Sequence, residues 1–258
     1  IRNRMQDLGF PIFVQSNDRS DDGFTSLSDR AAALIAKKVE EKNLQEDKSN
    51  KRAKKDNKIS SDEYAAWTCA AWLDVRSFGQ VFAFNKKKEK DAAGVSVGVR
   101  GPISIHQAVS IDPVELCSYQ ITKSVNGENK EGKEGKASDT MGMKHMIKFG
   151  MYEIKGAINV QLAEKTGFTD NDAEVVKKCL LSLFENDASS ARPDGSMEIV
   201  KLYWWQHSCK EGQYSSAKVH RSVKAKLKDG LSEAQSADDY DIVVNELPGL
   251  VPEVLEGV

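Results

Sequence analysis

The chain has 258 residues, of which 40% are hydrophobic and 29% are charged. These fractions are typical of a globular protein and argue against intrinsic disorder, and the length suffices for one elaborated domain or for two. No apolar run approaches the roughly 20 residues that cross a bilayer, so we expect no transmembrane segment and no membrane partner.

Cysteine and histidine usage gives no sign of a metal site. The four cysteines lie far apart in apolar or aromatic stretches, the four histidines are equally scattered, and no pair has metal-ligand spacing. We therefore expect no metal, no cofactor, and buried free thiols in a reducing cytoplasm, where the sequence places the protein. These residues are Cys69, Cys117, Cys179 and Cys209, and His106, His145, His207 and His220.

Charge is unevenly distributed along the chain. The C-terminal segment 231–258 contains seven acidic residues and no Lys or Arg. Removing those seven charges from the formal net charge of −2 leaves +5 on the rest of the chain, and residues 201–230 hold seven basic against two acidic side chains. A basic body with an acidic tail is compatible with a polyanionic ligand, although charge runs are usually solvated faces.

The N-terminal quarter predicts helices. Residues 1–5 (IRNRM) resemble the middle of a helix, and we expect residues upstream because the chain begins with Ile instead of Met. A polar turn at 18–24 precedes a helix over 27–42 with apolar residues at helical spacing. Residues 43–59 lack periodicity and predict an exposed loop, whose lysines could contact nucleic acid. A second helix is expected over 61–72.

Extended structure dominates the middle of the chain. Alternating polarity predicts strands over 103–110, 114–125 and 149–162. Between the last two lies a loop at 126–140 built from Lys, Glu, Gly, Asn and Ser, followed by SDTMGMKH at 138–145. Basic donors beside a flexible Gly suit a phosphate-rich partner, because the backbone can approach closely while a cation neutralises charge.

The C-terminal part returns to mixed elements. A change of period predicts a helix over 170–184, with Thr169 or Asp170 as its cap. A strand, a short basic helix and a last strand follow, at 197–207, 217–223 and 242–244.

This element order predicts an α+β protein. If a first strand precedes residue 1, the order is the β-α-β-β-α-β of a ferredoxin-like unit with large insertions. RNA-recognition domains share that topology and present an open sheet face to RNA, but topology alone does not give function.

An ordered series of motifs identifies a family resemblance. The motifs are IRN at 1–3, DVRSFG at 74–79, VRGPISI at 99–105, SIDPV at 110–114, ITKSVN at 121–126, SDTMGMKH at 138–145, LAEKTGF at 162–168 and FEND…SSAR at 184–192. With them the chain resembles the backbone subunit of the type I-C CRISPR surveillance complex (Cascade), the Cas-seven family (Csd/Csh type) of the RAMP superfamily.

The resemblance implies a hand-like architecture. The whole chain 1–258 would be one elaborated domain with a ferredoxin-like, RRM-like palm. Residues 18–73 would form a helical insertion in the fingers region, 123–148 a β-hairpin thumb, and 231–258 the acidic C-terminal segment. The family's initial strand and the loop after it are not in this sequence.

The resemblance also implies a function without catalysis. Copies of the chain would bind CRISPR RNA and associate head-to-tail along it as a helical oligomer. They would support pairing of the guide with target DNA in antiviral defence, together with subunits of the Cas-five and Cas-eight families.

The implied RNA-binding residues are mostly basic or lie in glycine turns. Arg100 stands between Gly98 and Gly101 at an expected strand start, where small neighbours let a phosphate approach. Met143 occupies a position where the family usually has a basic residue, which predicts one contact fewer. The implied set is Arg2, Arg4, Arg76, Arg100, Gly101, Lys123, Thr140, Met141, Gly142, Lys144, His145 and Arg192.

The alternative from another functional class is a RAMP-type endoribonuclease that cleaves target or precursor RNA. Asp139 beside Lys144 and His145 could act as part of an acid–base pair, whereas the simpler interpretation is a turn-forming Asp. A metabolic ferredoxin-like enzyme is disfavoured because the chain has no phosphate loop, dinucleotide fingerprint or metal cluster.

Overall fold

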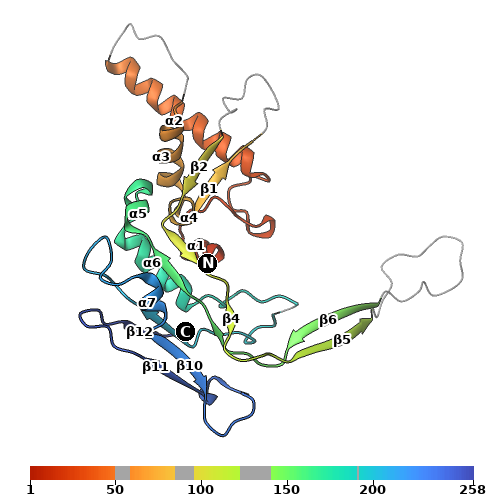
Figure 1. The fold of residues 1–258 in the computed structure, drawn as a ribbon. Helices are drawn as coiled ribbons and strands as arrows, with labels where there is room; N and C mark the ends of the chain where they lie inside the picture. The colour runs from red at the N-terminus through yellow and green to blue at the C-terminus, as the bar shows by residue number, and fades with distance from the viewer. Residues whose placement is uncertain (50–58, 85–95, 123–140, 191) are drawn as a thin grey trace, which may run out of the picture.

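The computed structural model describes residues 1–49, 59–84, 96–122, 141–190 and 192–258, and shows an α+β protein (Figure 1). This confirms the predicted class. The helices are α1 (Arg2–Asp7), α2 (Leu27–Ser49), α3 (Ser61–Ala71), α4 (Leu73–Phe78), α5 (Val160–Thr166), α6 (Asp170–Leu181) and α7 (Ser216–His220), with 3₁₀ turns η1 (Asn17–Arg19) and η2 (Ala237–Asp239).

The strands of the described residues form antiparallel two-stranded pairs. They are β1 (Gly79–Phe82) with β2 (Val97–Arg100), β3 (Ile103–Ile105) with β8 (Gly156–Ile158), β4 (Val109–Ser110) with β7 (Tyr152–Glu153), β5 (Leu116–Thr122) with β6 (Met141–Ile147), β9 (Lys201–Trp204) with β12 (Glu253–Glu256), and β10 (Val223–Leu227) with β11 (Tyr240–Val244). A continuous four-stranded RRM-like palm stays a prediction.

The body contains two larger apolar cores and a smaller one around Val219, Leu247 and Leu250. In the first, Phe13 and Phe82 pack their rings with centroids 5.2 Å apart, between α2, α3 and the β1–β2 hairpin. In the second, Met5 and Leu73 are fully buried against α6 and the β3–β8 pair. Because α4 contributes to both cores, it holds the helical part and the β3–β8 part together.

Local capping signals explain where helices begin. Thr169 is the N-cap of α6 and forms a capping box with Asp172, so the first of the two predicted caps is confirmed. Ser60 and Glu63 form the same box at α3, one residue ahead of the expected start. The Asn159 side chain accepts a hydrogen bond from the Leu162 amide, which starts α5.

Two predicted elements differ from the structure, and one helix was not predicted. The loop predicted from residue 43 is still helical up to Ser49, because Leu, Gln, Glu and Lys in this stretch are good helix formers. The predicted strand 149–162 is reduced to β7 and β8, since the Asn159 cap turns the chain into α5. The segment Leu73–Phe78, which carries most of the DVRSFG motif, is helix α4.

The acidic C-terminal segment is folded into the body instead of forming a separate tail. It contains β11 and β12, which pair with β10 and β9. Lys177 Nζ lies 2.7 Å from Glu253 Oε2, and Lys201 Nζ lies 3.3 Å from Glu256 Oε1. The acidic segment is therefore not electrostatically separate from the basic body, because ion pairs with α6 and β9 neutralise part of its charge.

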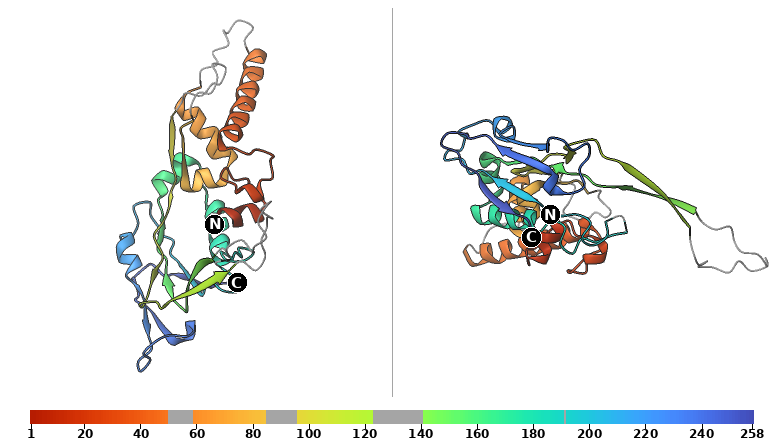
Figure 2. Two further views of the ribbon diagram at one scale, coloured as in Figure 1. Left: turned by 90° about the vertical axis from the view of Figure 1, so that its right-hand side faces the viewer. Right: turned by 90° about the horizontal axis from the view of Figure 1, so that it is seen from below.

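The β5–β6 ribbon extends away from the body, whereas α2 and the β1–β2 hairpin extend in another direction (Figures 1 and 2). The whole loop predicted at 126–140, and residues 123–140 of the thumb predicted at 123–148, lie outside the described residues. Of the segment predicted as the thumb, the structure describes strand β6, which pairs with β5 just ahead of that segment, and the thumb itself stays a prediction.

Candidate nucleic-acid interface

A tight backbone crossing positions Arg100 at the end of β2. Gly79, with φ +80°, ends α4 and begins β1 directly beside Gly101. A Cβ atom on Gly101 would lie 2.3 Å from the carbonyl carbon of Phe78, so only glycine fits there. The Arg100 side chain is exposed and has no ion-pair partner among the described residues. Arg100 therefore ends a strand, where the sequence predicted a strand start.

The two glycines that flank Arg100 differ in their surroundings. A Cβ on Gly98 would meet no atom within 4 Å, whereas Gly101 is in contact with the backbone of its own chain. Only Gly98 therefore leaves open space through which a phosphate could approach Arg100, as the sequence led us to expect of both glycines. Gly101 is required by the packing of α4 against β2.

Lys144 and His145 lie in β6, where they point to opposite faces of the ribbon. Lys144 is opposite Tyr119 and His145 is opposite Ser118, whose Oγ lies 2.8 Å from His145 Nδ1. Consecutive residues of a strand point to opposite sides. A nucleic acid that touched both side chains would have to pass around the ribbon or contact it on both faces.

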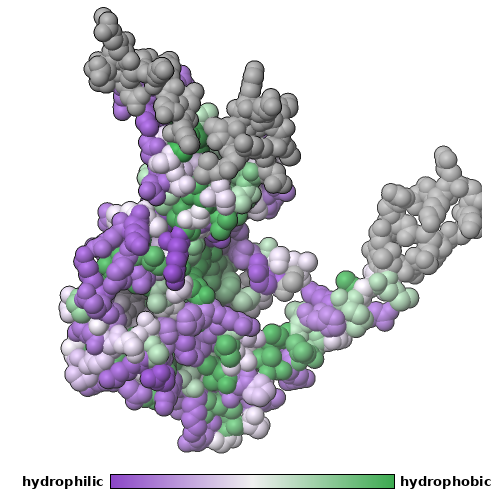
Figure 3. Space-filling view, turned by 45° about the horizontal axis from the view of Figure 1, so that its top comes forward, coloured by the Kyte–Doolittle hydropathy of each residue, from purple (hydrophilic) through white to green (hydrophobic). Residues whose placement is uncertain are grey.

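Large apolar side chains are exposed along this ribbon (Figure 3). Leu116 is 70% exposed and Met141 is 64% exposed. An isolated two-stranded ribbon is marginally stable in water, and exposed apolar side chains grouped in one place mark interaction surfaces. The ribbon has the features of a binding element that is completed by a partner. The exposed members are Leu116, Tyr119, Ile121, Met141, Met143 and Ile147.

Ion pairs hold the predicted arginines of α1. Arg2 Nε donates to Asp74 Oδ2 at 3.0 Å, and its guanidinium lies 5.4 Å from the centre of the Phe78 ring. Asp74 is fully buried and also accepts the amides of Phe13 and Val14. Arg4 donates to Asp7 and to Ser182 at the end of α6. These arginines connect α1 to α4 and α6.

Arg76 of α4 forms a two-point ion pair with Asp172 of α6. Its Nε and Nη2 lie 3.1 and 2.7 Å from the two carboxylate oxygens, and Asp172 also accepts the Thr169 amide. Burial alone would raise the pKa of Asp172, but the hydrogen bonds from Arg76 and Thr169 outweigh it and lower the pKa. The pair therefore stabilises the α4–α6 contact.

Arg192 lies in the irregular segment after α6. It is half-exposed, and its Nη2 lies 2.9 Å from an Asp187 carboxylate oxygen. Its backbone amide also donates to the Ser189 carbonyl in a tight turn. The guanidinium is thus directed by a local ion pair but remains accessible to solvent.

One open groove brings together part of the predicted set. Its volume is about 2320 Å³, and its lining includes Arg100, Gly101, His145 and Arg192. The residues Arg2, Arg4, Arg76, Met141, Gly142 and Lys144 are not part of its lining. Lys123 and Thr140 lie outside the described residues.

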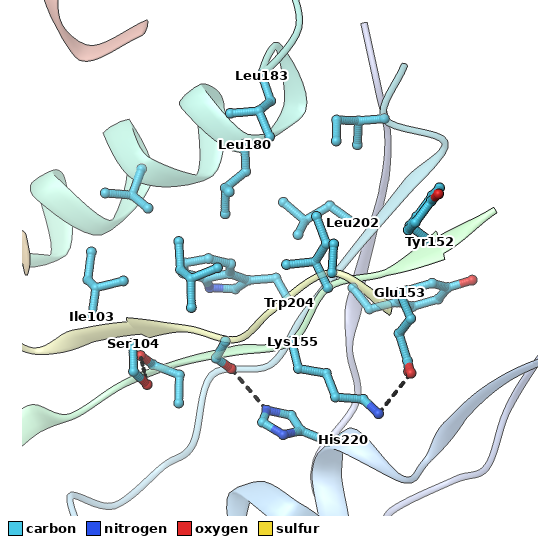
Figure 4. A pocket seen from close by; sticks show the side chains of 18 of the residues that line it. Ile103, Ser104, Tyr152, Glu153, Lys155, Leu180, Leu183, Leu202, Trp204 and His220 are labelled. Carbon is cyan, nitrogen blue, oxygen red and sulfur yellow. Dashed lines mark hydrogen bonds and ion pairs between the residues drawn. The ribbon is translucent and has the colours of Figure 1, made fainter. Parts of the chain in front are cut away.

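Two further polar residues of the groove were not predicted from the sequence. Lys155 lies 2.8 Å from Glu153, and His220 Nε2 lies 3.0 Å from the Gly156 carbonyl oxygen (Figure 4). The alternating pattern of FGMYEIKG places Glu153 and Lys155 on one face of a strand, so the position of Lys155 could have been predicted from the sequence. Nothing in the sequence indicated that His220 would reach β8.

The described residues contain no cluster of three or more His, Cys, Asp or Glu side chains that could hold a metal ion. Asp139, the residue considered for an acid–base pair, lies outside them. All four cysteines are free, and burial raises the pKa of Cys69 and Cys179 to about 11. Contrary to the expectation, Cys117 is only partly buried and Cys209 is exposed. Among helices of the described ranges, none is long and apolar enough to cross a membrane.

Comparisons with known proteins give a family match over most of the chain. The model of the family described as CRISPR-associated protein Cas7 matches residues 1–245. No curated protein matches the chain. Among solved structures, one similar chain belongs to a "CRISPR RNA-guided surveillance complex, pre-nicking", with 16% identity and a TM-score of 0.36. That match covers 68% of this chain and 44% of the other, so this chain spans less than half the length of its structural match.

Proposed function

Because the chain belongs to the CRISPR-associated protein Cas7 family, we propose that it binds CRISPR RNA as a non-catalytic backbone subunit of a surveillance complex. The observation that carries this proposal is the family match over residues 1–245. A match of that extent includes the helical part, the β5–β6 ribbon and the groove, so the proposal concerns the described fold up to β11.

The assembly belongs to the same proposal. Copies of the chain would associate head-to-tail along the RNA in a type I-C Cascade, with partner subunits of the Cas-five and Cas-eight families. A heterologous contact repeated in this way gives an open helical array instead of a closed ring. The projecting ribbon with its exposed apolar side chains supports this assembly, since it offers a surface for contacts beyond its own body.

Within the RNA site, the structure favours different tasks for different residues. Arg100 is exposed without an ion-pair partner among the described residues, and Lys144 and His145 lie on the projecting ribbon; we assign direct phosphate contacts to these three. The ion-paired arginines would present N–H groups to RNA from fixed positions, because a guanidinium has five donors. These are Arg2, Arg4, Arg76 and Arg192.

The remaining predicted contacts would be made mostly through backbone. Met141 and Gly142 begin β6, and Gly142 leaves room opposite Ile121, where a Cβ would lie 3.3 Å from a side-chain carbon. Gly101 presents backbone beside Arg100. Lys123 and Thr140 complete the proposed set on the loop that the ribbon supports.

This arrangement would read RNA shape and charge without reading sequence. Base pairing between guide and target DNA would provide the specificity, while the protein contacts the phosphate backbone of the guide. A cation that neutralises a phosphate releases counterions, so binding should weaken as salt rises.

The direct test is to express the tagged chain in cells that carry a CRISPR array and its partner subunits. We expect a defined RNA with repeat-derived ends to copurify, together with the partner subunits and further copies of the chain. Copurification of heterogeneous RNA without repeat sequence, or of none, would contradict the proposal. The purified protein should leave RNA intact with or without divalent metal; metal-dependent cleavage that is lost in Asp139→Ala would favour the endoribonuclease alternative.

A further inference from the structure

A side-chain hydrogen bond joins the two strands of the projecting β5–β6 ribbon (Figure 1). Ser118 Oγ lies 2.8 Å from His145 Nδ1, which is a normal distance for a hydrogen bond. The contact uses one of the two ring nitrogens, and Nε2 of His145 has no hydrogen-bond partner among the described residues. His145 is exposed, so Nε2 is accessible to a ligand.

The backbone of the ribbon explains why these two side chains meet. The Lys148 amide donates to the Glu115 carbonyl, so these two residues form a hydrogen-bonded pair of the antiparallel ladder. Hydrogen-bonded and non-hydrogen-bonded pairs alternate along such a ladder. Ser118 and His145 lie three pairs further along and are therefore a non-hydrogen-bonded pair, in which the side chains approach more closely. The strand register thus determines the contact.

The ribbon face that carries this pair is otherwise uncharged. The neighbouring pairs on the same face are Leu116 with Ile147 on one side and Gln120 with Met143 on the other, whereas Lys144 lies on the opposite face. Along this face of Leu116–Thr122 and Met141–Ile147, the imidazole is the one side chain that can carry a positive charge. Its hydrogen-bonding state therefore decides how this face meets an anion.

The hydrogen bond made by one ring nitrogen of a histidine determines the state of the other. In a neutral imidazole, one nitrogen donates and the other accepts. If the Ser118 hydroxyl donates to Nδ1 of His145, the ring proton is on Nε2, which then donates to a phosphate oxygen. If the proton were on Nδ1 instead, Nε2 would present a lone pair and repel the phosphate.

We propose that Ser118 is a positioning residue for RNA binding: its hydroxyl donates to Nδ1 of the neutral His145 ring and so keeps the proton on Nε2, which donates to a phosphate. The inference rests on the proposed function for the identity of the ligand. In the protonated ring, the hydroxyl rotates and accepts from Nδ1, so Nε2 remains a donor. Ser118 thus keeps the same ring nitrogen available to phosphate in both protonation states.

The first test reads the ring proton directly, in the protein without RNA. Nitrogen-15 NMR distinguishes a ring nitrogen that carries a proton from one that does not, and the His145 signals are assigned by their loss in His145→Gln. The spectra are recorded at pH 8, at the upper end of the range in which histidines change charge. We expect the proton on Nε2 in the wild type and a mixture of both tautomers in Ser118→Ala.

The second test measures whether Ser118 acts through His145. At pH 8, Ser118→Ala should weaken the binding of a fluorescein-labelled CRISPR RNA roughly three- to tenfold by anisotropy, as expected for one hydrogen bond. In the His145→Ala background, Ser118→Ala should cause no further loss, because two residues that act as one unit are not additive. Thermal unfolding of each variant, measured alongside, monitors the fold.

Two further variants separate the hydroxyl from its position in the strand. Ser118→Thr keeps the hydroxyl and should retain both the Nε2 tautomer and the wild-type affinity. Thr122→Ala removes a hydroxyl from the same face of β5, where the opposite residue is Met141 instead of a histidine. This matched control should bind RNA like the wild type.

Four outcomes would overturn the inference. They are a wild-type ring with its proton on Nδ1, the same tautomer in Ser118→Ala as in the wild type, additive losses of affinity in the double variant, and a loss in Ser118→Thr equal to that in Ser118→Ala. The tautomer is read without RNA and copurification of CRISPR RNA does not require this hydroxyl, so the inference and the proposed function fail separately.

Discussion

Two regions of the molecule differ in whether their basic side chains are ion-paired. The first region is α1 with α4, and the second is β2 with the β5–β6 ribbon. Arg2 and Arg76 each contact a carboxylate that is almost completely buried, Asp74 in one case and Asp172 in the other. Arg100 and Lys144 have no such partner among the described residues. Basic residues in family motifs therefore have two different roles. In the first region arginines hold helices together through ion pairs, and in the second region the positive charges remain available to a ligand.

The largest effect should come from removing the carboxylate at the centre of the first region. In Asp74→Ala, the amides of Phe13 and Val14 and the Arg2 guanidinium all lose their acceptor. We expect a loss of roughly 3–5 kcal/mol in the free energy of unfolding, measured by urea denaturation. Asp229→Ala is the matched control, because Asp229 is 91% exposed. Equal stability of the two variants would show that Asp74 does not hold this region together.

Alanine substitutions at the two glycines near Arg100 distinguish an effect on folding from an effect on RNA binding. Gly101→Ala would place a Cβ against the backbone of Phe78 and Gly79, which cannot move aside as a side chain could. We expect a loss of about 2–3 kcal/mol in thermal or urea unfolding. Gly98→Ala has space for its methyl group and should unfold like the wild type, so any loss of RNA affinity in Gly98→Ala would report on phosphate approach. A wild-type stability for Gly101→Ala would contradict the backbone crossing.

The Arg76–Asp172 pair gives the first region a dependence on pH. The pKa of Asp172 is lowered from its ordinary value of 3.8, so the stabilisation is fully present above that pH and is lost as the pH falls through the lowered value. Arg76→Gln should cost about 1–2 kcal/mol at neutral pH, and the difference from wild type should shrink below pH 3.8. Arg19→Gln, at an ion pair with Asp7 on the surface, should change little. A difference that stays constant down to pH 2 would exclude this ion pair as its source.

The smallest effect concerns Met143 in the second region. This side chain is 56% exposed on β6, on the face opposite to Lys144. Met143→Lys adds a cation where the resemblance to the family led us to expect one, so RNA affinity should rise roughly two- to fivefold at moderate salt, as measured by fluorescence anisotropy. Met143→Gln controls for the loss of the apolar side chain. A gain that equals that of Met143→Gln would show that charge at this position does not reach RNA.

Local signals in the sequence were sufficient for part of the fold. Thr169 or Asp170 ahead of a helical period predicts a capped helix, and α6 begins at Asp170 with Thr169 as its N-cap. The strand predicted over 149–162 was wrong from Asn159 onward, because the side-chain cap at this residue outweighed the alternating pattern. Such competition between a cap and a strand pattern is settled by tertiary packing, which periodicity does not contain.

The resemblance supplies the residues of the candidate site, which stay a prediction, but the sequence does not contain their geometry. Arg76 and Asp172 are separated by 96 positions in the chain, and no local pattern announces their ion pair. Likewise, Gly101 resembles a phosphate-binding glycine in the sequence, whereas the adjacent backbone of Phe78 determines its environment. Lys144 and His145 point in opposite directions because they are consecutive residues of strand β6. The sequence had led us to expect both residues on a loop, for which no such alternation holds.

The salt dependence of CRISPR RNA binding in Arg100→Ala/Lys144→Ala tests the central claim most directly. Each phosphate contact on a single strand contributes about 0.7 to the slope of log affinity against log salt, so losing two should reduce the slope by about 1.4. Arg19→Ala/Lys226→Ala removes the same formal charge from two ion-paired surface positions and should leave the slope unchanged. Affinity and slope equal to wild type in the Arg100→Ala/Lys144→Ala variant would contradict the assignment of RNA binding to the unpaired cations.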